Sequence, residues 1–480
     1  IGLTEQERVN LLFIFTDEQR YDTMAAYGNT RIEVPNLNRL ANEGIIFKRA
    51  YVTQPICTPS RASIMTGLYP HTVGCVANNI PLPEDVPVLP ELADFKEYSI
   101  GYIGKWHLGD EVFCQHGFDV WISIEDMYRR FYRPYRNRFK HSSYHDWLVS
   151  KGVKPPSKAE DGFEFFPRSF VRRLPEELCK PSFEAEMASN FIIQNKDHPF
   201  ILYVNFLEPH MPFFGPRDNQ YRPEDVILPE NFDAVPTEDQ PLKAQLAVKG
   251  IKDPYYRGCA WYNIYKRFFN KEIPTEEDWR RLIARYWGLV SQVDTAIGKI
   301  LDTLRKCGLE KNTIVVFTSD HGDMMGSHRL ITKGFQFEEA VRVPLIIKIP
   351  GHPKSGSVIT EPISQVDLVP TLLDLMGKPV PEGLDGYSLK SFIDGEGEMP
   401  EKNVFIEWFP ESMLFKGRSD EIDHPVITII TPEGWKYNWS SFGQHELYNL
   451  NEDPLETNNL IKNESYRPLV KRLQKEIERW

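Results

Sequence analysis

Long apolar runs are missing from this chain of 480 residues. No window reaches the roughly 18 consecutive apolar residues of a membrane-spanning helix, and the longest runs, at 313–317 and 345–347, have the length of buried strands. The opening IGLTEQER has neither the basic nor the apolar part of a secretory leader. The sequence therefore predicts no membrane span. A periplasmic or secreted location is favoured if a leader has been removed, and a cytoplasmic location is the alternative.

A surplus of basic residues and a cysteine motif are missing as well. The chain has 56 Lys+Arg against 68 Asp+Glu, a formal net charge of −12, whereas general binders of nucleic acid or anionic membranes carry a positive surplus. Nucleic acid and membranes are therefore not expected as partners. The six cysteines include no CxxC pair and have no histidine cluster at zinc spacing. With 41% hydrophobic and 26% charged residues, the chain is expected to fold.

Short β-rich runs alternate with helical patterns over most of the chain. The predicted strands are 10–15, 99–103, 200–206, 313–318 and 343–349. The predicted helices are 36–42, 60–66, 183–195, 278–306 and 367–376. Such alternation predicts an α/β fold with a large, mixed, mostly parallel sheet sandwiched by helices.

The pattern changes near residues 391–402. It continues in four shorter elements, three strands and a final amphipathic helix, at 404–408, 426–431, 434–438 and 466–480. We therefore predict a large α/β domain over residues 1–395, with insertions at about 125–180 and 213–275. Residues 396–480 are predicted to form a small C-terminal α+β subdomain with a short antiparallel sheet.

Polar side chains follow four of the predicted strands at the point where each strand ends. They are Asp17 and Glu18 after the first, Lys105 and His107 after the second, His210 after the third, and Asp320 and His321 after the fourth. In open α/β sheets the ligand crevice lies beyond the carboxyl ends of the strands. We therefore expect these side chains to meet in one site, although some 300 residues separate the first from the last.

The sharpest local signal is CTPSR at 57–61, followed by ASIMTG at 62–67. Cys57 stands just ahead of a predicted helix, whose free N–H groups and positive dipole end favour an anion. Arg61 adds a planar guanidinium one turn later. For an isolated cysteine, burial beside a helix-capping Ser60 is the simpler interpretation. The context of the segment reverses that preference.

CTPSR with the Ala-Ser and Thr-Gly that follow it resembles the signature of the type I, formylglycine-dependent sulfatases of the alkaline phosphatase superfamily. Further segments match in family order and cover most of the chain: DEQR at 17–20, VPNLNRLANEG at 34–44, GKWHLG at 104–109, EPHMPF at 208–213, SDHGD at 319–323, TKG at 332–334 and ELYNLNEDPLETNNL at 446–460. The resemblance implies an alkaline-phosphatase-like fold and a sulfuric ester hydrolase.

The resemblance also implies a Ca²⁺ ion held by Asp17, the modified Cys57, Asp320 and His321. Oxygen-rich donor sets favour Ca²⁺ or Mg²⁺ over zinc, so Mg²⁺ and Mn²⁺ stay open. Glu18 departs from the second Asp of many relatives, and we keep it as a candidate ligand. The family further implies that a formylglycine-generating maturation enzyme converts Cys57 into formylglycine.

The remaining site residues are assigned by the same resemblance. Lys105 and Lys333 are expected to bind the sulfate, and His107 is expected to contact the formylglycine hydrate. A hydroxyl of that hydrate, activated by the cation and by Arg61, attacks sulfur while the positive groups neutralise the developing charge. His210, with Lys333 assisting, is the candidate acid for the departing alkoxide, and His107 is the candidate base for sulfate release.

Two segments and one residue pair are candidates for substrate contact. Residues 128–141 hold five Arg and one Lys among five aromatic residues, which suits an anionic sugar chain and equally a surface or subunit contact. Residues 240–269 are rich in Tyr and Trp. His328 and Arg329 follow the SDHGD segment and are hypothesised to touch the leaving-group side. A sulfated mono-, oligo- or polysaccharide is the favoured substrate.

Three alternatives stay open at this point. Formylglycine-dependent relatives in the same superfamily hydrolyse phosphonate monoesters and phosphodiesters, although Ser60 matches the sulfatase form of the motif, where phosphonate hydrolases tend to carry Ala. An aryl or choline sulfatase is the second alternative. A non-catalytic glycan-binding relative is the third, but such a protein is expected to have lost a site residue, and all of them are present in this sequence. The sequence does not specify an oligomeric state.

The formylglycine chemistry predicts the behaviour of Cys57→Ser. A serine hydroxyl can attack sulfur once, but it lacks the second hydroxyl whose deprotonation expels sulfate. We expect the variant to stall after one turnover with sulfate trapped on the protein, measured as a single burst of released alcohol and an increase in protein mass. Sustained turnover at the wild-type rate would contradict the role given to residue 57.

Overall fold

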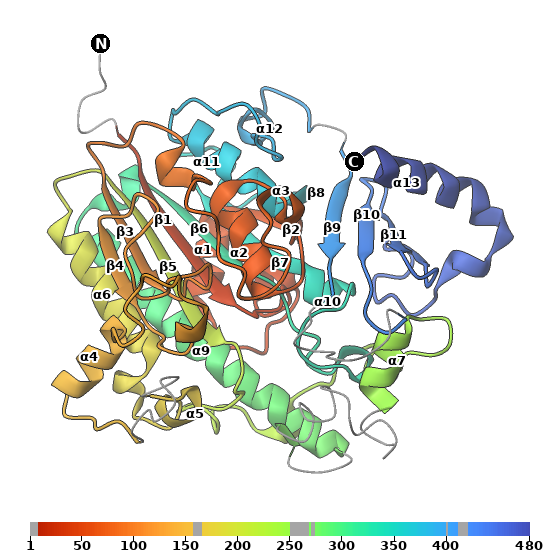
Figure 1. Cartoon of the computed structure of the whole chain (residues 1–480), viewed down its shortest axis with the longest axis horizontal. Helices are drawn as coiled ribbons and strands as arrows, with labels where there is room; N and C mark the ends of the chain where they lie inside the picture. Colours follow the sequence, from red (N-terminus) through yellow and green to blue (C-terminus); the bar gives the residue numbers. More distant parts are fainter. Residues whose placement is uncertain (1–7, 157–165, 250–267, 270–273, 400–401, 411–420) are drawn as a thin grey trace.

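The computed structural model describes residues 8–156, 166–249, 268–269, 274–399, 402–410 and 421–480. Its centre is an eight-stranded sheet in the order β4-β3-β5-β1-β6-β7-β2-β8 (Figure 1). The strands are β1 (Asn10–Asp17), β2 (Ile45–Tyr51), β3 (Ser99–Gly104), β4 (Val120–Ser123), β5 (Phe200–Pro209), β6 (Thr313–Ser319), β7 (Arg342–Lys348) and β8 (Val358–Ser364). β7 runs antiparallel to both of its neighbours, and the other pairs are parallel. The predicted mostly parallel α/β sheet is confirmed.

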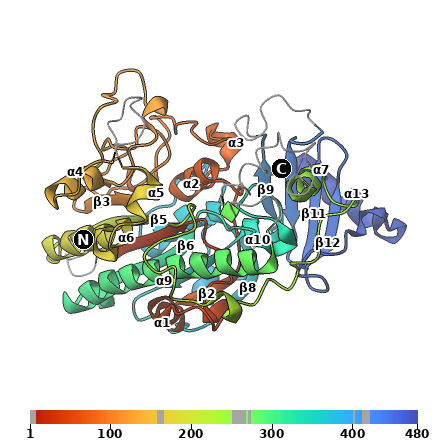
Figure 2. The same cartoon turned by 90° about the horizontal axis from the view of Figure 1, so that it is seen from below.

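Helices cover both faces of this sheet, as Figure 2 shows from below. One face packs against α1 (Pro35–Glu43), α6 (Lys180–Gln194) and α9 (Glu276–Lys306), and the other packs against α2 (Cys57–Thr66) and α11 (Leu368–Leu375). Successive residues of β1 alternate between the two layers, with Leu12 in the first and Phe13 in the second. Because both faces are covered, every residue of β1 is buried, which explains its nearly continuous apolar sequence.

Shorter helices lie in the connections between these elements. They are α3 (Pro70–Val73), α4 (Ser143–Ser150), α5 (Arg168–Val171), α7 (Leu242–Lys249), α10 (Glu338–Val341) and α12 (Lys390–Asp394). None of the helices in the described ranges combines the length and the apolar composition needed to cross a membrane.

The five strands and five helices predicted for this part all appear, with bounds within three residues of the predicted ones. Three strands of the sheet are not predicted: β2, β4 and β8. β2 includes Lys48 and Arg49, which interrupt its apolar pattern, and β4 has only four residues. β8 is an edge strand that contains Pro362, a residue that sheets tolerate at their edges. Tertiary pairing therefore recruits segments whose local patterns are weak.

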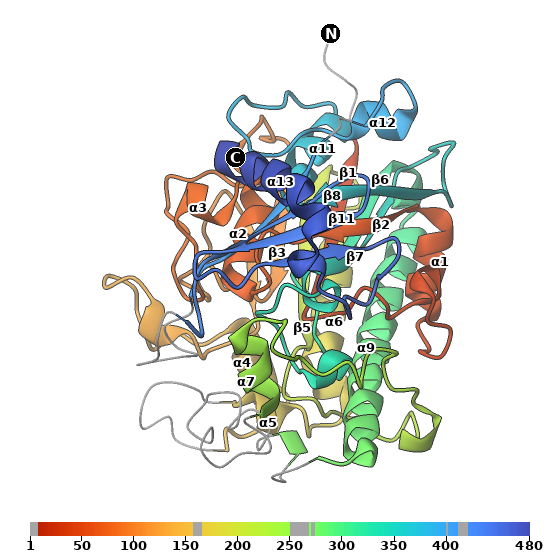
Figure 3. The ribbon, with the colours of Figure 1, turned by 90° about the vertical axis from the view of Figure 1, so that its right-hand side faces the viewer.

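A second, four-stranded antiparallel sheet lies beside the large one, as Figure 3 shows. Its order is β12-β11-β10-β9, from strands β9 (Val404–Trp408), β10 (Val426–Ile430), β11 (Trp435–Ser440) and β12 (Glu446–Asn449). Leu473 of α13 (Arg467–Arg479) belongs to the apolar cluster of this sheet. The predicted antiparallel sheet and final helix are confirmed, and β12 is an addition. The domain boundary at residue 395 stays a prediction.

The carboxyl ends of four strands meet near the middle of the large sheet. β1 pairs with β5 on one side and β6 on the other, and β5 pairs with β3. Asp17 ends β1, Lys105 follows β3, His210 follows β5, and Asp320 follows β6. The predicted convergence of these polar residues is therefore a direct result of parallel pairing.

Gly104 ends β3 in a conformation that predicts a large loss of stability when another residue replaces it. Its φ is 118°, and a Cβ at this position would lie 2.0 Å from the Asn205 carbonyl oxygen. Strain and a backbone clash each cost about 1–3 kcal/mol, so we expect Gly104→Ala to lower the free energy of unfolding by more than about 2 kcal/mol in denaturant titration. Gly308→Ala is the control, because Gly308 also has a positive φ but no atom within 4 Å of the added Cβ. Equal losses in both variants would contradict the clash.

Candidate active site

Arg61 joins the ends of four strands. Its guanidinium donates from Nη2 to Asp17 Oδ2 (2.8 Å) and from Nε to Asp320 Oδ2 (2.9 Å). Nη1 donates to the Asn205 side chain (2.5 Å) and to the Lys105 carbonyl (2.9 Å). The guanidinium is buried, with 1% of the Arg61 side chain exposed. One side chain from α2 therefore contacts residues at the ends of β1, β3 and β6 and Asn205 within β5.

Four ligand atoms lie together beside this guanidinium. Asp17, Cys57, Asp320 and His321 each present one, and the four atoms lie within 4.8 Å of one another. Arg61 binds Oδ2 of both carboxylates, and each Oδ1 lies within 3.7 Å of His321 Nε2. His321 Nδ1 donates to a backbone carbonyl (2.9 Å), so the lone pair of Nε2 faces Cys57 Sγ at 3.3 Å. The predicted ligand set, apart from Glu18, forms one buried group whose carboxylates suit a hard divalent cation.

Charge differs sharply between Asp17 and Cys57. Burial alone would raise the pKa of Asp17, but Lys105, whose ammonium pairs with Oδ2, and other nearby cations hold it well below the ordinary value. Burial, together with the charge of Asp17, raises the pKa of the Cys57 thiol to about 12. An unmodified Cys57 is therefore a neutral thiol and a poor nucleophile. Cys57 is the first residue of α2, since this helix begins three residues earlier than predicted.

Lys105 and His107 lie on a turn that Glu111 holds in place. The Glu111 carboxylate accepts from the backbone N–H groups of Trp106 (2.8 Å) and His107 (2.7 Å). His107 Nε2 donates to Asn79 Oδ1 (3.0 Å), so Nδ1 carries the lone pair, and this buried atom has no hydrogen-bond partner among the described residues. Burial and the charge of Lys105 hold the pKa of His107 well below its ordinary value. His107 is therefore a neutral imidazole with an available basic nitrogen.

Lys333 and His210 form a hydrogen-bonded pair. Lys333 Nζ donates to His210 Nε2 (3.0 Å), and His210 Nδ1 donates to the Met211 carbonyl (2.8 Å). Burial and the charge of Lys333 hold the pKa of His210 well below its ordinary value. Burial alone would lower the pKa of Lys333, but the Glu18 carboxyl group, which accepts a hydrogen bond from its ammonium, and the Asp17 carboxylate raise it. The shared proton therefore belongs to Lys333.

Glu18 lies beside the four-atom group and not within it. Its carboxylate accepts from Lys333 Nζ (2.8 Å) and lies 3.5 Å from His210 Nε2. With Asp17 and His210 it forms a second group of ligand atoms within 4.8 Å of one another. Burial raises the pKa of Glu18 to about 8, against the opposing effect of Lys333. A metal-ligating role for Glu18 stays a prediction.

Glu125, Tyr128 and Arg168 form a largely buried network that supports both His107 and His210. The sequence patterns did not indicate this network. Tyr128 stacks on His107 with ring centroids 4.2 Å apart, and its hydroxyl accepts from Arg168 Nη2 (2.9 Å). Arg168 Nη1 lies 3.4 Å from His210 Nδ1, while Arg168 Nε donates to Glu125 (2.7 Å). The Arg-rich aromatic composition of 128–141 pointed to this region, but it did not distinguish Tyr128 from its neighbours.

The two segments predicted to contact the substrate, 128–141 and 240–269, are described by the structure to different extents. In 128–141, Arg133 and Arg136 pair with Asp110 at 2.7 and 3.1 Å, which uses part of the positive charge within the protein. Phe139 of the same segment is 75% exposed. Of the segment 240–269, residues 250–267 lie outside the described residues.

His328 and Arg329 contact the segment 231–234. His328 Nδ1 donates to the Ala234 carbonyl (2.7 Å), and its ring stacks on Phe337 with centroids 4.2 Å apart. Arg329 pairs with Asp233 at 2.5 Å. These contacts anchor the loop that follows the SDHGD segment and involve no predicted site residue, so they give no support to the hypothesis of substrate contact.

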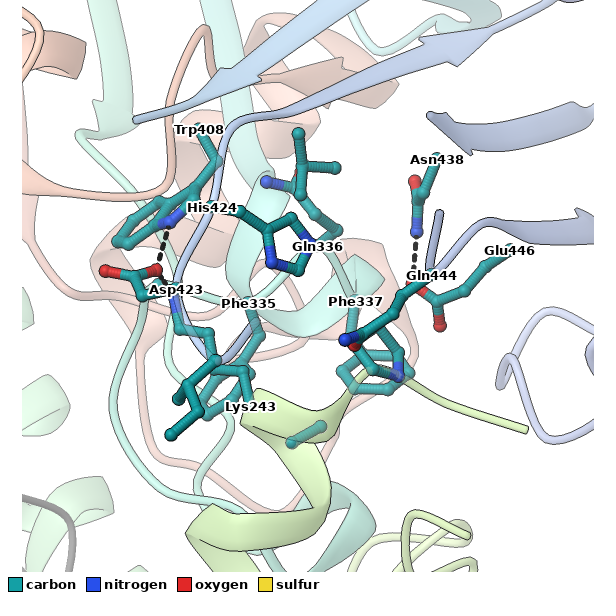
Figure 4. A pocket seen from close by; sticks show the side chains of 15 residues that line it. Lys243, Phe335, Gln336, Phe337, Trp408, Asp423, His424, Asn438, Gln444 and Glu446 are labelled. Atoms are coloured by element: carbon teal, nitrogen blue, oxygen red, sulfur yellow. Dashed lines mark hydrogen bonds and ion pairs between the residues drawn. The ribbon is translucent and has the colours of Figure 1, made fainter. Parts of the chain in front are cut away.

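A cavity of about 50 Å³, shown in Figure 4, has Gly334, the residue after Lys333, in its wall. Gly334, in its wall, donates its N–H to the carbonyl of Pro55 (3.1 Å), which stands in the turn before α2. Lys243 of α7 lies over the ring of Trp408, with Nζ 3.5 Å from the centroid. Other lining side chains are Phe335, Phe337, His424, Asn438, Gln444 and Glu446. The cavity thus joins aromatic and polar groups from the large domain and the small sheet.

Comparison with known families identifies the class of protein. Residues 9–378 match the Sulfatase family, and residues 326–480 match the family described as N-sulphoglucosamine sulphohydrolase, C-terminal. The chain therefore belongs to the sulfatase family of the alkaline phosphatase superfamily. It is a sulfuric ester hydrolase, as the sequence resemblance implied.

Relatives match the chain from end to end. An N-acetylglucosamine-6-O-sulfatase of Bacteroides thetaiotaomicron is 28% identical, over 99% of this chain and 86% of that protein. An arylsulfatase of Clostridium perfringens is 30% identical, over 97% and 93%. Among solved structures, a phosphonate monoester hydrolase from Silicibacter pomeroyi has a TM-score of 0.78 at 23% identity, over 98% and 95%. The similarity to this solved structure is a similarity of fold.

The hydrogen bond between Asn79 and His107 predicts a kinetic effect of Asn79→Ala. Without the Asn79 acceptor, the tautomer of His107 is no longer specified. Since acid–base catalysis contributes about 10²–10⁴-fold, we expect kcat to fall by on the order of 10- to 100-fold with little change in KM, measured by steady-state kinetics. Asn458→Ala, in an exposed turn, is the control. An unchanged kcat in Asn79→Ala would rule out this orienting role.

Proposed function

We propose that the protein removes sulfate from a sulfated carbohydrate, with formylglycine derived from Cys57 as nucleophile and a Ca²⁺ ion bound beside it. The observation that carries this proposal is the buried group of Asp17, Cys57, Asp320 and His321 next to two lysines and two histidines. The N-acetylglucosamine-6-O-sulfatase that matches nearly the whole chain supports a sugar sulfate as the substrate.

The nucleophile and the cation have distinct tasks. Hydrated formylglycine at position 57 supplies one hydroxyl that attacks sulfur and a second whose later deprotonation releases sulfate. Asp17, Asp320, His321 and residue 57 would hold a Ca²⁺ ion, which would supply positive charge at the reacting group. Mg²⁺ and Mn²⁺ fit the same donors. The maturation enzyme that makes formylglycine is a required partner under this proposal.

His107 is the proposed base for sulfate release. Its buried Nδ1 carries a lone pair, and the low pKa of the imidazole keeps it neutral and ready to accept a proton. Tyr128 holds the ring by stacking, and Lys105 adds positive charge for the sulfate on the same turn. Preorganised charge of this kind stabilises a transition state without reorganisation.

Lys333 and His210 together are the proposed acid for the departing alkoxide. The sequence pointed to His210 as the main acid, but the hydrogen bonds and charges favour Lys333 as the group that carries the proton. His210 orients the ammonium through Nε2. When the S–O bond breaks, the alkoxide oxygen takes a proton from Lys333, and His210 stabilises the neutral amine that results.

The cavity beside Lys333 is the proposed place for the sugar that departs. Gly334 in its wall follows the proposed acid Lys333 in the chain and donates its N–H to the carbonyl of Pro55, two residues before Cys57. Sites for small ligands combine apolar and aromatic walls with a few polar groups, and this cavity has Phe335 and Trp408 together with Gln444 and Glu446. A sugar ring has the matching mixture of apolar faces and hydroxyl groups.

The acid role predicts that Lys333→Ala responds to the leaving group. An alkoxide of a sugar needs a proton, whereas an acidic phenol departs without one. We expect kcat to fall by on the order of 100-fold or more on a sugar sulfate and by clearly less on an activated aryl sulfate. Lys105→Ala is the matched control, because a sulfate-binding lysine affects both substrates alike. If kcat of Lys333→Ala fell equally on both substrates, Lys333 would be a sulfate-binding residue and not the acid.

A desulfation screen tests the function directly. Wild-type protein, with its formylglycine content measured by mass spectrometry, is incubated with sulfated mono- and oligosaccharides, an aryl sulfate, choline sulfate and an aryl phosphonate monoester, with Ca²⁺ and after chelation. We expect the highest kcat/KM on a sugar sulfate and loss of activity on chelation. A preference for the phosphonate would establish the superfamily alternative, and a preference for the aryl or choline ester would exclude a carbohydrate substrate.

A further inference from the structure

A further group of metal-ligating side chains lies at the start of α4, which stands at the lower left of Figure 1. His141, His145 and Asp146 each present one ligand atom, and the three atoms lie within 4.8 Å of one another. The two imidazole rings are stacked with centroids 3.8 Å apart and planes 24° apart. His141 Nδ1 lies 3.3 Å from Asp146 Oδ1. The group shares no residue with the catalytic site.

Asp126 holds His145 in a defined orientation. Asp126 Oδ2 lies 3.4 Å from His145 Nδ1. The same carboxylate accepts from the backbone N–H of Ser142 (2.6 Å) and pairs with Arg129 at 3.4 Å. A carboxylate near Nδ1 favours the tautomer whose Nε2 carries the lone pair, an orientation that is common among metal-ligating histidines. Since the side chains of His145 and Asp126 are only 4% and 6% exposed, the fold itself provides this orientation.

We propose that His141, His145 and Asp146 form a binding site for a divalent transition-metal ion of the zinc type. Two imidazoles and one carboxylate match the donors that Zn²⁺ prefers, whereas Ca²⁺ prefers a set made of oxygen atoms. Water completes the coordination, because His141 and Asp146 are 38% and 71% exposed. The positive dipole end of α4 and Arg129, which pairs with Asp126, work against a cation, whereas Asp126 and Asp146 favour one.

A bound ion would have a structural effect at this place. His141 ends the Arg-rich segment 128–141, and the other two ligands belong to α4, so one ion connects the segment to the helix. Tyr128 at the start of that segment stacks on His107. The ion therefore stabilises the far end of a segment whose near end supports the catalytic site, and it takes no part in sulfate cleavage.

Calorimetric titration of the full, tag-free protein with ZnCl₂ in excess CaCl₂ tests this site. We expect the wild type to bind one Zn²⁺ more per chain than His141→Ala or Asp146→Asn. Both side chains are exposed, so these variants are expected to fold. His198→Ala, which removes an exposed histidine elsewhere, is the matched control and keeps the wild-type number. Zn²⁺ that enters the catalytic group is counted equally in all four proteins.

Two further readouts separate this site from the catalytic one. Asp126→Asn keeps the three ligands but weakens the orienting carboxylate, and we expect it to weaken Zn²⁺ binding by about 10- to 100-fold. Zn²⁺ is expected to raise the thermal midpoint of the wild type and not of Asp146→Asn, while hydrolysis in Ca²⁺ alone is the same in both. The proposal is overturned if the wild type binds no more Zn²⁺ than His141→Ala, or if His198→Ala loses the same amount.

Discussion

The geometry of the site depends on the buried guanidinium of Arg61. Two carboxylates at the ends of β1 and β6 are removed from water, which costs several kcal/mol for each ion unless it is paired. Arg61 binds Oδ2 of both, and its remaining donor joins them to Asn205 and to the Lys105 carbonyl. Because a guanidinium is planar and rigid, these strand ends cannot move independently. The Oδ1 atoms are directed to Cys57 and His321 as a consequence.

Three largely buried cations lie at the site although the chain as a whole is acidic. The chain has a net charge of −12, yet Arg61, Lys105 and Lys333 converge on a small buried region next to the strand ends. Crowding by these cations and burial keep both His107 and His210 neutral. An anionic ester can therefore meet positive charge on lysine and arginine, while the imidazoles stay available as proton acceptors. The net charge of the whole chain therefore says little about the charge at the site.

Sequence patterns specified most of the fold because burial leaves a strong local signal. β1 and β6, covered on both faces, are continuous apolar runs, and they were found together with the polar residues at their ends. β2 and β8 were missed because Lys48, Arg49 and Pro362 weaken their patterns, and only pairing with β7 and with each other makes them strands. The same limit applies to Tyr128, which lies in a segment marked only as Arg-rich and aromatic, and to Arg168, which no motif marked.

The candidate reacting groups could thus be proposed from the sequence. CTPSR matches a family signature. The positions of Asp17, Lys105 and Asp320 after predicted parallel strands were enough to predict that they lie close together. Proton positions and orientation were decided by tertiary structure alone. Whether Lys333 or His210 holds the proton, and whether Glu18 faces Lys333 or the cation group, depends on distances of a few ångströms between segments far apart in the chain. Electrostatic and hydrogen-bond energies vary steeply over such distances, and the linear order of residues does not encode them locally.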